Sequence, residues 1–273
     1  MDYRTQMTGN RPGLIIIFVD TSGSMAFIHI GGLTKVVSAG NSINRAVLEL
    51  LVLNLKEEGI QNKCKIVVIE YGNNNGIVME KDLAQLANES DQLPTTSVDS
   101  DGGTIEIPNY VSGLQAGGGT PMAQAFETAY SIIENFCQNN PENFPPICIN
   151  ITDGAPNNSV ATAKAMEKSK SLGTNYGKTL LFNFHISSNS SGEVIFPTDR
   201  NELSDSTGKF LYDTASIIPA PMLGVAVKKG LLAKENSKLM VSNASPKTLT
   251  EVLLFGSTVA AGGETAPDTF SYS

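Results

Sequence analysis

Hydrophobic residues follow two patterns along this chain: short unbroken runs, and longer segments in which apolar positions recur every three or four residues. Unbroken runs rich in β-branched and aromatic residues are typical of strands buried on both faces of a parallel sheet. Such runs predict strands over residues 14–19, 65–71, 147–151 and 179–186. A shorter apolar triplet predicts a further strand over residues 210–212.

The spacing of three to four residues predicts helices between these strands. It is seen over residues 36–56, ending near Gly59, and over residues 121–136, where Pro121 occupies the first turn and its missing N–H costs nothing. Weaker patterns predict further helices over residues 159–171, 200–206 and 221–233. Ser245 and Pro246 predict the start of one more short helix, which continues through Leu254.

The alternation of strands and helices predicts an α/β fold with a doubly wound, mostly parallel central sheet and helices on both faces. Between residues 77 and 110 the pattern is weaker, and it predicts edge strands at Val78 and at 105–107 with a polar loop between them. We expect an N-terminal tail over residues 1–11, one domain over 12–242, and a short helix with a flexible tail over 243–273.

Composition narrows the function classes. The 273 residues are 41% hydrophobic, which is enough for a full core, and 19 Lys+Arg against 27 Asp+Glu give a net charge of −8. This acidic balance argues against a protein that coats nucleic acid or an anionic membrane. The three cysteines, Cys64, Cys137 and Cys148, show no C-x-x-C spacing and are predicted to be reduced core residues. With no apolar signal segment or membrane-length run, we expect a cytoplasmic protein.

Polar oxygen donors follow two of the predicted strands. Asp20, Ser22 and Ser24 alternate in the loop after the first strand, and Asp153 directly follows the strand over residues 147–151. The parallel sheet would bring the carboxylates of Asp20 and Asp153 to one edge. A further hydroxyl, that of Thr120, follows a run of three glycines before a predicted helix. Carboxylates and hydroxyls without His or Cys form a hard-oxygen set, suited to Mg²⁺, Mn²⁺ or Ca²⁺ and poorly suited to Zn²⁺.

Together, the loop D-x-S-x-S, Thr120 and Asp153 resemble the metal-ion-dependent adhesion site of a von Willebrand factor A domain, a Rossmann-like fold. The resemblance spans about residues 12–238, and the surrounding DTSGSM, GGGTP and TDG sequences agree with it. It implies that Ser22 and Ser24 are direct ligands of Mg²⁺ (alternatively Mn²⁺ or Ca²⁺). It implies that Thr120 is gained or tightened as a ligand when a partner binds, and that Asp20 and Asp153 hold the metal directly or through water.

The resemblance also implies a function. We expect a metal-dependent protein-binding module whose cation is completed by an Asp or Glu carboxylate of a partner protein. The chain is similar to stand-alone bacterial cytoplasmic members of the family linked to tellurium resistance, which implies a scaffold or regulatory role with a kinase and a phosphatase. Two alternatives stay open: a metal-dependent hydrolase or phosphatase, and a structural subunit with an idle metal site.

Other residues argue against catalysis. The glycine run before Thr120 lacks the Gly-Lys-Ser/Thr ending of a phosphate-binding loop, and neither His29 nor His185 stands in a recognisable nucleophile motif. We therefore predict that the protein is not an enzyme. His185 is predicted in the core or at a strand edge and His29 on a loop surface. The apolar loop over residues 26–34 is interpreted either as a rim for a partner or as a segment folded onto the core.

Overall fold

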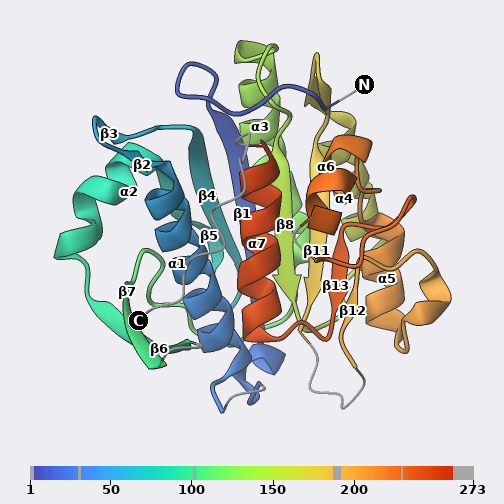
Figure 1. Ribbon diagram of the computed structural model, residues 1–273. Helices are drawn as coiled ribbons and strands as arrows, with labels where there is room; N and C mark the ends of the chain where they lie inside the picture. Colours follow the sequence, from blue (N-terminus) through green and yellow to red (C-terminus); the bar gives the residue numbers. More distant parts are fainter. Residues whose placement is uncertain (1–2, 30–31, 101–102, 187–191, 229, 261–273) are drawn as a thin grey trace.

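The computed structural model describes residues 3–29, 32–100, 103–186, 192–228 and 230–260. Its centre is a seven-stranded sheet with the strand order β12-β13-β11-β8-β1-β4-β5 (Figure 1). The five inner strands run parallel: β1 (Gly13–Thr21), β4 (Cys64–Gly72), β8 (Ile147–Thr152), β11 (Leu180–His185) and β13 (Met240–Ser242). The two edge strands, β5 (Asn75–Asp82) and β12 (Val194–Ile195), are antiparallel to their neighbours.

Helices cover both faces of this sheet (Figure 1). One face carries α1 (Lys35–Asn54), α2 (Leu83–Glu89), α6 (Ala220–Lys228) and α7 (Pro246–Ala260). The other carries α3 (Met122–Asn139), α4 (Ser159–Ser171) and α5 (Ser206–Thr214). Successive strand side chains point to opposite faces, so β1 sends Ile15 and Ile17 into one core and Ile16 and Phe18 into the other. The predicted fold class is confirmed.

Short elements complete the part of the chain that the structure describes. Three two-stranded ribbons lie outside the sheet: β2 (Leu55–Lys56) with β3 (Gly59–Ile60), β6 (Thr95–Ser100) with β7 (Gly103–Pro108), and β9 (Gly173–Thr174) with β10 (Gly177–Lys178). Single 3₁₀ turns are η1 (Gly23–Ala26), η2 (Ser90–Gln92) and η3 (Arg200–Glu202).

The prediction of a strand over residues 210–212 is wrong, because these residues lie in helix α5. The helix begins after Asp205, whose carboxylate accepts a hydrogen bond from the backbone N–H of Gly208 at 2.7 Å. An apolar triplet is too short to distinguish a strand from a helix face. The fifth parallel strand is instead β13, in a buried run centred on Val241.

Four further predictions need correction. The polar loop expected between Val78 and residues 105–107 contains β6 and helix α2, whose first turn is closed by a capping box between Asp82 and Gln85. Strand β7 pairs with β6 rather than with the sheet. The helix expected over 200–206 is the 3₁₀ turn η3, and the one expected over 221–233 ends at Lys228, just before Gly230, which has a φ of +75°.

Both ends of the described chain contribute to the core. Helix α7 packs against α1 and buries Leu249, Val252, Leu253 and Phe255, and Met7 from the N-terminal segment is fully buried. The core therefore includes residues on both sides of the domain limits predicted from the sequence. The flexible tail predicted at the C-terminus lies, from residue 261 onward, outside the described residues.

Helix α1 is long and apolar enough to cross a membrane by length and composition alone, with a mean hydropathy of 1.3. However, 61% of that window is buried inside the protein. Its apolar positions, among them Ile43, Val47 and Leu50, pack in the same cluster as the β1 residues Ile15 and Ile17. The core packing accounts for the hydrophobicity of this helix.

Candidate metal centre

Asp20 lies at the carboxyl edge of the sheet and is fully buried. Its Oδ1 accepts a hydrogen bond from the backbone N–H of Ser22 at 2.7 Å, and its Oδ2 accepts one from the Thr152 hydroxyl at 2.5 Å. Thr152 ends β8, the strand next to β1, so the parallel pairing of these two strands positions the donor. Both carboxylate oxygens are thus held in a fixed orientation.

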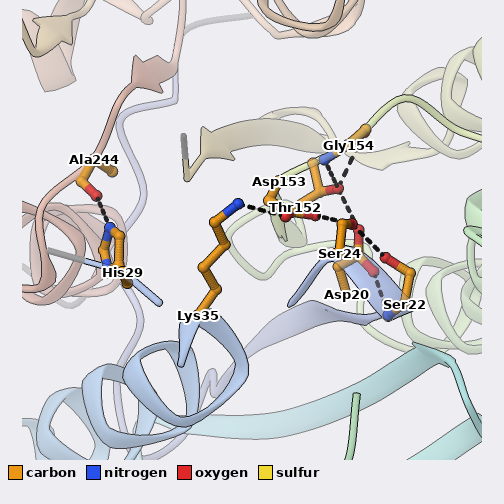
Figure 2. A network of polar contacts seen from close by, with 9 residues as sticks. All are labelled: Asp20, Ser22, Ser24, His29, Lys35, Thr152, Asp153, Gly154 and Ala244. Atoms are coloured by element: carbon orange, nitrogen blue, oxygen red, sulfur yellow. Dashed lines mark hydrogen bonds and ion pairs between the residues drawn. The ribbon is translucent and has the colours of Figure 1, made fainter. Parts of the chain in front are cut away.

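Three further oxygens converge beside Asp20 (Figure 2). The hydroxyl of Ser24 donates to Oδ1 of Asp153 at 2.6 Å, and the hydroxyls of Ser22 and Ser24 lie 3.2 Å apart. In an octahedral Mg²⁺ shell with metal–oxygen distances near 2.1 Å, neighbouring ligand oxygens are about 3 Å apart. The spacing of these three oxygens therefore fits two adjacent edges of such a shell.

The loop that carries Thr120 lies against the Ser22–Ser24 segment. The backbone N–H of Gly23 donates to the carbonyl of Gly118 at 3.1 Å, and that of Gly117 donates to the carbonyl of Thr21 at 2.8 Å. Gly118 has a φ of +70°, and a Cβ at this position would lie 2.7 Å from the carbonyl oxygen of Gly72. A glycine is therefore required for this loop to pass close to the end of β4.

Thr120 is held through its main chain by Asn157. Its backbone N–H donates to Oδ1 of Asn157 at 2.8 Å, and its carbonyl accepts from the backbone N–H of Asn157 at 2.9 Å. Ser22, Ser24, Asp20 and Asp153, in contrast, are linked through side-chain contacts. The structure thus groups four of the predicted residues directly and brings the fifth to them on an adjacent loop.

Lys35 is a polar member of this group that sequence reasoning missed. Its Nζ lies 2.7 Å from Oδ2 of Asp153 (Figure 2). The side chains of Lys35 and Asp153 are only 7% and 1% exposed. Lys35 is the first residue of α1, and its long side chain reaches the loop after β8. A single Lys in an otherwise uncharged first helical turn is the only signal the sequence gives. Thr152 and Asn157, which orient Asp20 and Thr120, were also missed.

Burial dominates the electrostatics of Asp20. It raises the pKa of this carboxyl to about 6, although the hydrogen bonds from Ser22 and Thr152 lower the pKa. The negative charge of Asp153 adds a smaller raising effect. A buried carboxylate beside a second one is stabilised by a cation, and the donors here are hard oxygens. Among the described residues, no cluster of three or more His, Cys, Asp and Glu side chains is arranged to hold a metal.

The structure corrects the prediction for His29, which is buried rather than on the loop surface. Its Nε2 lies 3.1 Å from the carbonyl oxygen of Ala244 (Figure 2). Its Nδ1 lies 2.9 Å from the Ser38 hydroxyl. Burial lowers its pKa. The neighbouring Phe27 and Ile28 are 65% and 60% exposed, so this loop is partly folded back and partly open to solvent.

The remaining polar predictions agree with the structure. His185 is buried at the end of β11, with Nδ1 3.5 Å from the Ser242 hydroxyl. The three cysteines, Cys64, Cys137 and Cys148, are free and buried, as expected of core residues.

Solved structures with similar chain paths show the fold. The minor pilin PilB from Streptococcus sanguinis matches with a TM-score of 0.50 and 11% identity, over 89% of this chain and 60% of that one. The pilus adhesin SpaC from Lactobacillus rhamnosus GG matches with a TM-score of 0.50 and 12% identity, over 91% of this chain and 30% of that one. These likenesses agree with the doubly wound α/β fold described above.

Manganese-loaded TRAP from Plasmodium vivax also matches, with a TM-score of 0.36 and 14% identity, over 64% of this chain and 57% of that one. The chain therefore spans less than two thirds of the length of each of these three proteins. No protein-family model matches the chain, and no curated protein matches it. At such low identities the likeness concerns the fold alone.

Proposed function

We propose that this protein is a metal-dependent protein-binding module. Asp20, Ser22, Ser24, Thr120 and Asp153 would hold a divalent cation, Mg²⁺ or alternatively Mn²⁺ or Ca²⁺, and a carboxylate of a partner protein would complete its coordination. The observation that carries this proposal is the convergence of three oxygens, with separations of 2.6 and 3.2 Å, at the carboxyl edge of the sheet.

The contacts divide the roles among the residues. The mutual contacts of the Ser22 and Ser24 hydroxyls and Oδ1 of Asp153 support a role for these three oxygens as direct ligands. Asp20 already accepts a hydrogen bond on each oxygen, which suits it to orient the Ser22 loop and to hold ligand water. The cation would supply positive charge and coordination positions for an external oxygen ligand.

Binding rather than catalysis fits the surroundings. Both histidines of the chain are buried among internal polar groups: His29 contacts Ser38 and Ala244, and His185 contacts Ser242 and the backbone of Asp153. This burial leaves neither imidazole open to an external substrate as a general base. The exposed Phe27, Ile28 and Leu33 lie on the loop that leads into α1 and offer apolar contact area to a partner.

The finer assignment rests on the sequence resemblance. On this resemblance the protein would act in a bacterial, cytoplasmic stress or signalling system with a kinase and a phosphatase as partners. These two classes are the first to screen among proteins retained by the immobilised chain in the presence of Mg²⁺ and released by chelator.

Metal binding itself is tested by calorimetric titration of Mg²⁺ and Mn²⁺ into the full chain. We expect saturable binding that Asp20→Ala abolishes and that Asp91→Ala, which removes an exposed carboxylate elsewhere, leaves unchanged. For partner binding, proteins captured by the wild type should be lost both with chelator and with Asp20→Ala. Capture that survives both treatments would contradict the proposal.

One observation favours a second candidate, a structural subunit with an idle metal site. The ammonium group of Lys35 already supplies a positive charge to Asp153. On this alternative neither Mg²⁺ nor Mn²⁺ gives saturable binding at millimolar concentrations, and partner capture is indifferent to chelator.

A further inference from the structure

We propose that Lys35 sets the metal affinity of this site: its ammonium group competes with a divalent cation for Asp153 and weakens metal binding. This inference rests on the proposed metal centre and goes beyond it, because Lys35 is not one of the ligand residues. It makes Lys35 a residue that tunes affinity through another side chain.

The ion pair between Lys35 and Asp153 is short and buried. Nζ and Oδ2 are 2.7 Å apart, and neither side chain is more than 7% exposed. In such a position the attraction between the charges is much stronger than at the surface, and dissolved salt screens it little. A cation approaching Asp153 therefore meets a carboxylate whose charge is already compensated.

The same carboxyl group would have to serve two cations. Oδ2 of Asp153 contacts Lys35, whereas Oδ1 accepts from Ser24 on the side of the predicted ligands. The two oxygens belong to one small group, so a metal on Oδ1 would lie a few ångströms from the ammonium, and the two positive charges would repel. The formal charge of the site is −2 from Asp20 and Asp153, and Lys35 reduces it to −1.

The backbone at Lys35 is held in place by the preceding loop. Its N–H donates to the carbonyl of Phe27 at 3.0 Å, and the N–H of His29 donates to the carbonyl of Leu33 at 2.7 Å. The His29 ring fixes the same loop to Ala244 at the beginning of the α7 segment (Figure 2). The ammonium can leave Asp153 only by a change of side-chain conformation or by a movement of this loop.

The test compares Mn²⁺ binding to the full-length wild type, Lys35→Met and Lys164→Met by calorimetry. Lys35→Met removes the ammonium and keeps the apolar stem, and Lys164→Met removes the same charge from an exposed position on α4. We expect Lys35→Met to lower the Kd for Mn²⁺ at least about tenfold, because a nearby full charge is removed from a site of low solvent exposure. Lys164→Met should leave the Kd within about twofold of wild type.

A second measurement tests the same idea through stability. Without metal, Lys35→Met leaves Asp153 buried without its counter-charge, so its Tm should fall below that of wild type. Saturating Mn²⁺ should then raise the Tm of the variant more than that of the wild type. If Lys35→Met does not fold, Lys35→Gln keeps a hydrogen-bond donor without the charge and should show the same gain in affinity.

The outcomes separate this inference from the proposed function. If the wild type binds Mn²⁺ through Asp20 and a folded Lys35→Met or Lys35→Gln variant binds it equally or more weakly, the role of Lys35 is overturned and the metal centre stands. If the wild type does not bind Mn²⁺ but the Lys35 variants do, Lys35 blocks the site and metal-dependent function is overturned. If no form binds Mn²⁺, both are overturned.

Discussion

Thr152 provides the sharpest test of how the site is held together. It is fully buried, and its hydroxyl donates to Oδ2 of Asp20 at 2.5 Å. The hydroxyl oxygen of Thr152 also accepts from the backbone N–H of Gly154 at 3.2 Å. Thr152→Val keeps the shape of the side chain and removes both interactions. Asp20 then loses one of the two donors that hold its carboxylate.

The magnitude follows from the two lost contacts. A hydrogen bond to a charged group contributes about 1.5–3 kcal/mol and a neutral one about 0.5–1.5 kcal/mol, so the free energy of unfolding should fall by about 3 kcal/mol. For a domain of this size that corresponds to a decrease in Tm of about 6–12 °C. We expect this decrease in Tm in chelator-treated protein. In a separate titration, Thr152→Val should bind Mn²⁺ more weakly than the wild type.

Thr162 offers a matched control. It is also buried, and its hydroxyl has no hydrogen-bond partner among the described residues. Thr162→Val should therefore be neutral or slightly stabilising, because it replaces an unsatisfied buried oxygen with a methyl group. The assay is thermal unfolding followed by circular dichroism. Equal Tm changes in the two variants would refute the claim that Thr152 acts through Asp20.

Three other predictions concern separate parts of the structure. Gly118→Ala should destabilise the protein by about 1–3 kcal/mol in chemical denaturation and weaken Mn²⁺ binding, because Gly118 has a φ of +70° and the new Cβ would lie 2.7 Å from the carbonyl oxygen of Gly72. Gly224→Ala in α6, with open space around it, should change neither the stability nor Mn²⁺ binding. Burial lowers the pKa of His29, so the unfolded chain binds more protons as the pH falls through about 6.5, and stability should decline there. His29→Gln should reduce the dependence of the free energy of unfolding on pH, by up to one proton, in denaturation curves recorded from pH 7 to 5. An unchanged pH dependence would contradict the lowered pKa of His29. Burial raises the pKa of the Cys64 thiol to about 12 and also raises that of the Cys148 thiol. Both thiols should therefore react with a thiol reagent only after unfolding. Rapid labelling of either thiol in the native protein would contradict their buried positions.

The inner strands of the sheet were predictable because burial on both faces requires continuous apolar residues. The runs before Asp20 and before Thr152 predicted β1 and β8 to within two residues of their observed ends. Residues 210–212 were misassigned because three apolar residues carry no period, although Asp205, five residues before Phe210, is a helix-capping signal. Helix α2 could have been found from the capping pair Asp82 and Gln85.

The site was predictable only in part. Asp20 lies near the end of β1 and Asp153 directly follows β8, and the parallel pairing of these two strands brings both to one edge. The position of Lys35 depends instead on how the loop after η1 folds and where it starts α1. That path is set by long-range contacts such as the one between His29 and Ala244, 215 residues apart, which no local pattern encodes.

The packing of α7 has a practical consequence for any shortened or transplanted version of this fold. Four of its side chains, Leu249, Val252, Leu253 and Phe255, are buried, and each contributes about 1.5–3 kcal/mol. Their sum, about 6–12 kcal/mol, is comparable to the whole stability of a typical domain. A chain cut at residue 242 would also remove the Ala244 acceptor of His29. The smallest unit that folds and keeps its loop in place therefore extends at least through Phe255.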